Sequence, residues 1–96
     1  MADPRREERL RNSVDLVSRI VDQVCANHLQ IENHGLKDSN PAYEVWVKYN
    51  DKIITLHSFS SLEIESCTDP DGQTAIKRRE YIRSVIRQKL EVLLTA

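Results

Sequence analysis

The sequence predicts a small α+β domain in the order α-β-β-β-α, in which N- and C-terminal helices cover one face of an antiparallel three-stranded meander. Three observations support this prediction: an apolar stripe at helical spacing near the start, two alternating segments joined by Asn50-Asp51, and a second helical pattern at the end. A chain of 96 residues has room for one such domain. We therefore expect residues 1–96 to form a single domain.

The first helix is predicted over residues 4–30. Pro4 suits a first helical turn, and Asp3 is the expected N-cap. Apolar residues recur at three- and four-residue steps and form a stripe that continues to His28: Leu10, Val14, Val17, Val21 and Val24. Leu16 and Ile20 widen this stripe on one side. Residues 33–41 are rich in Asn, Gly, Ser and Pro, so we expect a loop there.

Two strands are predicted at residues 43–49 and 52–58. Between Tyr43 and Tyr49, apolar and aromatic residues alternate with polar ones and with Trp46, as in a half-buried strand. Asn50 and Asp51 both tolerate left-handed backbone angles and therefore suit a two-residue hairpin turn. Such a turn places Val47 opposite Ile54 and Val45 opposite Leu56, so that the apolar faces of the two strands coincide.

A third strand is predicted at residues 62–67 and the last helix at residues 73–94. In the strand, Leu62 and Ile64 alternate with Glu63 and Glu65, which we expect to face water. The turn residues of 68–72 separate this strand from the helix.

Composition excludes several classes of protein. The formal net charge is -1, so no overall field attracts nucleic acid or a membrane, and only 5% of the residues are aromatic. The N-terminus is charged and lacks the apolar core of a signal peptide, and no run of 18 apolar residues could span a bilayer. We expect a cytoplasmic or nuclear protein without a membrane role, and Cys25 and Cys67 to be buried thiols.

The sequence offers no catalytic or metal-binding constellation. The three histidines, His28, His34 and His57, match no zinc spacing, and no other residue completes a ligand set. The predicted register places His57 opposite Glu44 on the outer sheet face. We expect Glu63 and Glu65 to be exposed to solvent side by side. We therefore predict a non-enzymatic protein with no cofactor and no metal.

The C-terminal helix carries two apolar stripes. One side holds Ile76, Ile82, Ile86, Leu90, Leu93 and Leu94, and a separate side holds Tyr81, Val85 and Val92. Such a helix packs on its own sheet with one stripe and binds a partner with the other. The alternative is that the sheet and the first helix bury both stripes.

Residues 79–93 resemble the C-terminal helix of the glycogen synthase kinase interaction protein family. The run Gln88-Lys89-Leu90-Glu91-Val92-Leu93 is similar to the Gln-Arg-Leu-Glu-Ala-Leu ending of that helix, and Ala42-Tyr43 is similar to the opening of its strands. The same domain occurs in clustered-mitochondria proteins. The resemblance implies a scaffold whose helix lies in a groove of a glycogen synthase kinase-type kinase, as the kinase-binding helix of axin does. The implied kinase-binding residues are Ile82, Ile86, Leu90 and Leu93. Arg87 departs from the pattern, because the family has an apolar residue beside the second anchor.

The first helix is also similar to anchoring helices for the regulatory subunit of protein kinase A. Those helices carry apolar pairs every four residues, and the residues that match here are Ser13, Leu16, Val17, Ile20, Val21 and Val24. The resemblance implies A-kinase anchoring. The same stripe is needed to cover the sheet, so core packing is the competing interpretation.

Two other functions stay open at this point. The element order is also that of double-stranded-RNA-binding domains, and Lys77-Arg78-Arg79 opens the last helix where that family has basic residues. The family's Gly-Pro-x-His loop is missing, and a solvated basic helix face is the competing interpretation. The chain could instead be a structural subunit of a larger complex. Trp46, predicted on the sheet face away from the helices near Thr55, would then mark a contact or dimer surface.

Overall fold

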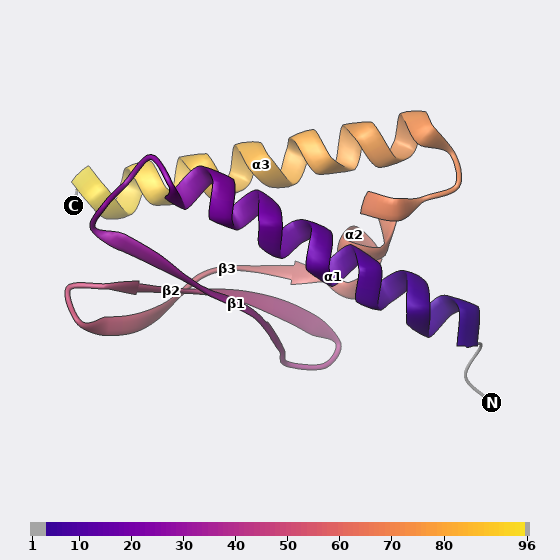
Figure 1. Cartoon of the computed structure of the whole chain (residues 1–96), viewed down its shortest axis with the longest axis horizontal. Coiled ribbons are helices and arrows are strands. Elements are labelled where there is room, and N and C mark those ends of the chain that lie inside the picture. The colour runs from indigo at the N-terminus through magenta and orange to yellow at the C-terminus, as the bar shows by residue number, and fades with distance from the viewer. Residues whose placement is uncertain (1–3, 96) are drawn as a thin grey trace.

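Residues 4–95 are described in a computed structural model, in which a layer of helices lies against a layer of strands (Figure 1). In chain order the elements are α1 (Pro4–Cys25), β1 (Ile31–Asp38), β2 (Ala42–Tyr49), β3 (Lys52–Ser60), α2 (Ser61–Glu65), the 3-10 helix η1 (Ser66–Thr68) and α3 (Gly72–Thr95). The expected N-cap Asp3 lies outside the described residues. Within residues 4–95 we find no helix that is both long and apolar enough to cross a membrane.

The sheet is antiparallel with strand order β1-β2-β3. The two long helices, α1 and α3, lie side by side on the same face of the sheet and run in the same direction (Figure 1). The predicted α+β layout, a three-stranded meander covered on one face by the N- and C-terminal helices, is therefore confirmed.

The first helix ends at Cys25 and not at residue 30 as predicted. The Ala26 amide still donates to the Asp22 carbonyl at 2.9 Å, but the His28 amide donates to the Cys25 carbonyl, also at 2.9 Å, in a tighter turn. The buried stripe also ends at Cys25, because Leu29 is fully exposed. A helix extended to residue 30 would bury no further apolar surface.

The loop predicted over residues 33–41 is wrong, because residues 33–38 belong to β1. The register with β2 shifts between Asn33 and Leu36, which marks a β-bulge. Gly35 has φ +85° there, and its amide donates to Oδ1 of Asn33 at 2.8 Å. Asn33 also donates from Nδ2 to Oδ1 of Asp22 at 2.7 Å, which ties the strand to α1. The residues typical of loops therefore build the bulge.

The hairpin between β2 and β3 has the predicted turn and an altered register. Asn50 and Asp51 have φ values of 52° and 62°, as a type I′ turn requires, and Val47 pairs with Ile54 as expected. Beyond this pair a bulge at Leu56 shifts the register, so that Val45 pairs with His57. The predicted pairs of Val45 with Leu56 and of His57 with Glu44 are therefore wrong, and Ser58 stands opposite Glu44.

The third predicted strand, residues 62–67, is also wrong: these residues form α2 and η1. Oγ of Ser60 accepts a hydrogen bond from the Glu63 amide at 3.1 Å, and Oε1 of Glu63 accepts one from the Ser60 amide at 3.0 Å. This capping box fixes a helix start and satisfies two amides that a strand ending here would leave open. The alternation from Leu62 to Glu65 is therefore coincidental.

The core lies between the two layers and takes residues from every long element. Its buried members are Val17, Ile20, Val21, Val24, Cys25, Ile31, Val45, Val47, Phe59, Ile64, Cys67, Ile82, Ile86 and Leu90. The prediction that Cys25 and Cys67 are buried is confirmed, and burial raises the pKa of the Cys67 thiol to about 11. The buried Ser13 hydroxyl is 2.6 Å from that of Thr68, which joins α1 to η1 inside the core.

Candidate protein-binding surface

The start of α3 is fixed by a cluster of side-chain hydrogen bonds from the turn before it. Oδ2 of Asp71 accepts from the Thr74 hydroxyl at 2.7 Å, and Oδ1 accepts from the Gln73 amide at 3.3 Å. Donation by the Thr74 hydroxyl is the main reason why the pKa of Asp71 is lowered. This N-cap fixes where the helix begins and so which of its faces meets the sheet.

The first stripe of α3 is part of the core. Ile82, Ile86 and Leu90 are fully buried, and Leu93 is half-buried against the same cluster. Three of the four predicted kinase-binding side chains are therefore enclosed by the sheet and α1, and the fourth is at the edge. Ile76, predicted on this stripe, is instead exposed. In the folded domain these four predicted anchors are not presented to a partner.

The second stripe of α3 faces outward. Tyr81 and Val92 are 45% and 61% exposed, and Val85 is half-buried at the border of the core. Positions 81, 85 and 92 are four and seven residues apart, which places them within a narrow sector of the helix. These three side chains, which we call the outer stripe, lie along one side of α3, where the exposed Gln88 separates Val85 from Val92.

Basic side chains border the outer stripe. The Arg78 guanidinium lies 5.3 Å from the centre of the Tyr81 ring, and its Nη1 lies 3.6 Å from Oε2 of Glu63 on α2. Lys77 and Lys89 are both exposed nearby on the same helix. The pKa of His57 is lowered, mainly by burial and next by the positive charge of Lys89. The negative charge of Glu63 opposes this shift. The surface therefore combines apolar contacts with a basic margin.

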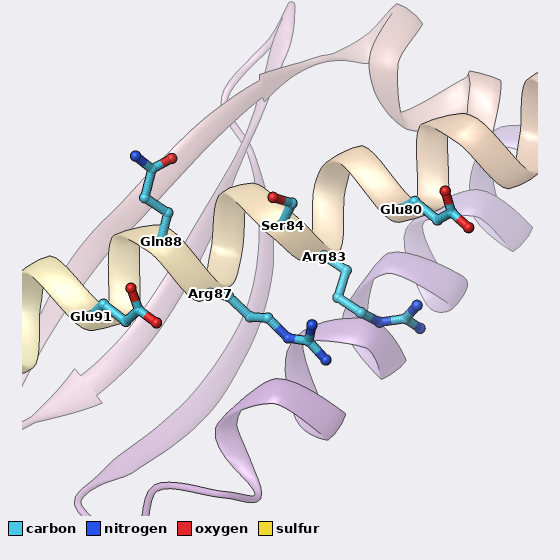
Figure 2. A pocket seen from close by; sticks show the side chains of 6 residues that line it. All are labelled: Glu80, Arg83, Ser84, Arg87, Gln88 and Glu91. Atoms are coloured by element: carbon cyan, nitrogen blue, oxygen red, sulfur yellow. The ribbon is translucent and has the colours of Figure 1, made fainter.

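The side of α3 between the core and the outer stripe is polar and hollowed, as Figure 2 shows. The hollow has a volume of about 470 Å³, and its lining residues are Glu80, Arg83, Ser84, Arg87, Gln88 and Glu91. Arg83 and Arg87 extend to the same side (Figure 2). Nη2 of Arg83 also donates to Oε1 of Gln23 on α1 at 3.4 Å. Two guanidinium groups and two carboxylates balance each other, so this hollow favours neither an anion nor a cation.

A second hollow lies between the N-terminal half of α1 and the sheet. Its volume is about 350 Å³, and it is lined by Glu7, Leu10, Arg11, Val14, Leu36, Asp38 and Tyr43. The pKa of the Tyr43 hydroxyl is raised, mainly by burial and further by the negative charges of Asp38 and Glu65. Sequence patterns do not predict this hollow, because Leu36 and Tyr43 come together only through the pairing of β1 with β2.

The residues that resemble a protein kinase A anchoring stripe lie in the core. Val17, Ile20, Val21 and Val24 are buried, and Leu16 packs against the core from the edge. The Asn33 side chain adds hydrogen bonds to Asp22 and to the Ser18 carbonyl of the same helix. In the folded domain this stripe covers the sheet, as the competing interpretation expects.

The basic run at the start of α3 is partly engaged within the domain. Arg78 lies near Glu63 and Tyr81, and Nε of Arg79 donates to the Ala75 carbonyl at 3.3 Å. Lys77 is exposed. Of the three residues expected to hold RNA in that alternative, Arg78 and Arg79 are half-buried.

The three histidines are dispersed. His28 follows α1, His34 lies at the β1 bulge with Nε2 3.8 Å from Oε2 of Glu32, and His57 stacks edge-on against Phe59 at 4.6 Å. The described residues include no group of three or more His, Cys, Asp or Glu side chains that could hold a metal ion. The expected solvated pair of Glu63 and Glu65 is wrong, because Glu65 is 7% exposed and lies 4.0 Å from Arg9.

Comparison with protein-family models, with curated proteins and with solved structures finds no match for this chain. The outer stripe and its basic margin are therefore the candidate protein-binding surface on the described part of α3.

Proposed function

We propose that this chain is a non-enzymatic protein-binding module that docks a glycogen synthase kinase-type kinase through α3. The observation that carries the proposal is the exposed apolar outer stripe on a helix whose other stripe is already buried. The choice of partner rests on the resemblance of residues 79–93 to the kinase-binding helix of the interaction protein family. Helix-in-groove recognition requires this kind of exposed apolar line.

The energetics favour the outer stripe over the anchors that the resemblance implies. Burial of each of Ile82, Ile86 and Leu90 stabilises the fold by about 1.5–3 kcal/mol. Their combined contribution is comparable to the entire stability of a typical small domain, about 5–15 kcal/mol. A partner that bound these three side chains would have to offset the loss of the core. Contact through Tyr81, Val85 and Val92 leaves the core intact.

The charges around the outer stripe indicate which kind of kinase groove would bind it. Arg78, Lys77 and Lys89 border the stripe, so a groove with apolar walls and an acidic rim complements it. Apolar contacts at the centre would supply the affinity, and the charged margin would orient the helix.

A titration of the purified kinase with the full chain tests the proposal. The double variant Tyr81→Ala/Val92→Ala should weaken binding at least tenfold, because it removes both exposed anchors of the outer stripe. Leu62→Ala is the control, because it truncates an exposed apolar side chain on α2, outside the outer stripe, and should leave the affinity unchanged. Circular dichroism verifies that each variant is folded.

Two results would count against the proposal. One is that the wild-type chain fails to bind the kinase at concentrations up to ~100 μM, where even weak specific complexes form. The other is that the double variant binds as tightly as the wild-type chain, which would place the contact on another surface.

A further inference from the structure

The sheet has a second face that no described helix covers. Figure 1 shows both long helices on the opposite side of the strands. Trp46 lies at the centre of the open face, on the middle strand β2, and Thr55 stands opposite it on β3, as the sequence predicts. Ile53, also on this face, is 53% exposed. An aromatic and an aliphatic side chain thus lie on a face that residues 4–95 leave open.

The charges on this face follow an alternating pattern. On β1, Glu32 is near one end and Lys37 near the other. On β2 the order is reversed, because Lys48 stands opposite Glu32 and Glu44 stands opposite Lys37. The neighbours of these four residues, among them the buried Val45 and Val47, point into the core, so the four charges face outward with Trp46. β1 and β2 therefore each carry one charge of each sign, on either side of the level of Trp46.

Local contacts hold the Trp46 side chain in this arrangement. Its Nε1 donates to Oε1 of Glu44 at 3.2 Å, and Nζ of Lys37 lies 5.9 Å from the centre of its ring. Oε2 of Glu32 lies 3.8 Å from Nε2 of His34, also near the bulge opposite Trp46. A side chain held in place loses less conformational entropy when a partner covers it.

We propose that a second copy of this chain docks on the open face of the sheet. The two copies are related by a two-fold axis midway between the two sheets. The axis is parallel to the sheets and perpendicular to the strands, at the position of Trp46 along β2. Rotation about this axis places each strand opposite the same strand of the second copy, running in the reverse direction. Glu44 then meets Lys48 of the other copy, Glu32 meets Lys37 of the other copy, and the two Trp46 side chains meet at the centre.

The charge pattern selects this arrangement over the other simple one. A two-fold axis along the strands would place Glu44 against Glu44 and Lys48 against Lys48, which is repulsive. The perpendicular axis instead gives four pairs of opposite charge, because each of the two different pairs occurs twice. Sheets that pack face to face in this way have an interlayer spacing of about 10 Å.

The small size of the face predicts a weak dimer. Three strands of eight, eight and nine residues at about 4.8 Å spacing cover only a few hundred Å², less than the roughly 800 Å² per partner of a standard interface. We therefore expect a dimer that forms and dissociates with concentration and that weakens at high salt, since its pairs of charges are near solvent.

Sedimentation and fluorescence of the wild-type chain test the first part of the proposal. Trp46 is the only tryptophan, so its emission reports directly on the centre of the face. Sedimentation equilibrium should show a monomer–dimer equilibrium, and the emission of Trp46 should shift to the blue over the same concentration range. A monomer at every concentration, or a dimer whose formation leaves Trp46 emission unchanged, would overturn the proposal.

Two charge variants test the geometry. Lys48→Glu places the introduced carboxylate against Glu44 of the second copy, and Glu44→Lys places the introduced ammonium group against Lys48 of the second copy. Each variant alone should therefore raise the dissociation constant of its homodimer at least tenfold. An equal mixture restores both contacts, because positions 44 and 48 then carry two carboxylates in one copy and two ammonium groups in the other. The mixture should dimerise at least tenfold more tightly than either variant alone; because Glu44→Lys also removes the hydrogen bond from Trp46, the comparison is with the single variants.

The mixture also guards against variants that fail to fold. Recovery of the dimer in the mixture shows that both variants are folded and that positions 44 and 48 face each other. If each variant dimerises as the wild-type chain does, the dimer uses another face. If neither variant nor their mixture dimerises while both give native circular dichroism spectra, the two-fold arrangement is wrong.

Discussion

Leu90 and Val92 are two residues apart on α3 and lie in opposite environments. Leu90 is fully buried against the sheet, whereas the Val92 side chain is 61% exposed. Because a helix turns by about 100° per residue, positions two apart point to nearly opposite sides. Both are aliphatic, so their position on the helix decides which one stabilises the fold and which one is available to a partner.

Truncation of the two side chains should therefore have unequal effects on stability. We expect Leu90→Ala to lower the free energy of unfolding by about 2–5 kcal/mol, because it leaves a cavity in the core. Val92→Ala should change it by no more than about 0.5 kcal/mol, as expected for an exposed side chain. Urea denaturation followed by circular dichroism measures both. Similar losses in the two variants would show that α3 does not pack as described.

At the scale of elements, β1 depends on its bulge. Gly35 adopts φ +85°, a conformation that residues with a side chain rarely adopt, although a Cβ there would meet nothing within 4 Å. The bulge also places Asn33 where it hydrogen-bonds to α1. A strain at Gly35 would therefore affect both the edge of the sheet and the contact between the two layers.

Gly35→Ala should destabilise the domain by about 1–2 kcal/mol, the cost of a left-handed conformation for a residue with a Cβ. Gly72→Ala is the matched control, because Gly72 opens α3 with no left-handed angle and with open space around it. Alanine there should be neutral or slightly stabilising. Thermal unfolding of the two variants provides the comparison, and equal melting temperatures would argue against the bulge geometry.

Elements with a simple periodic pattern could be predicted, and those built from local hydrogen bonds could not. The β2–β3 hairpin follows from alternation and from Asn50-Asp51, and α3 follows from its helical spacing. α2 is fixed by the Ser60–Glu63 capping box, a signal that is present in the sequence but was outweighed by the alternation of Leu62 to Glu65. β1 was missed because Asn33 and Gly35 are residues typical of loops that here build a bulge.

The candidate site could be predicted only in part. The sequence shows that α3 has two apolar stripes, and the structure places Tyr81 and Val92 on an exposed one. Periodicity does not tell which stripe meets the sheet, because both consist of aliphatic or aromatic residues. That choice depends on how α3 leaves η1 after Asp71, which is a tertiary property.

At the scale of the whole molecule, the two proposed surfaces belong to different layers. The outer stripe lies on α3 in the helical layer, and the Trp46 face is the far side of the sheet (Figure 1). One surface can therefore be occupied while the other is free. A dimer formed through the sheets would present two copies of α3 on its outer sides, and so could hold two kinase molecules at once.

Both proposals require the core to remain closed when a partner binds. Docking through the outer stripe leaves Ile82, Ile86 and Leu90 between the layers, whereas docking through those three residues would separate α3 from the sheet and from α1. The two modes therefore differ in what happens to elements that the kinase does not touch. Amides of α1 and β2 should stay protected in the first mode and become exposed to solvent in the second.

Hydrogen–deuterium exchange of the full chain, free and saturated with the kinase, is the most direct test. We predict that α1 and β2 exchange as slowly in the complex as in the free chain, and that exchange slows further along α3 around Tyr81 and Val92. Faster exchange in α1 and β2 on binding would show that α3 leaves the core, and would contradict docking through the outer stripe.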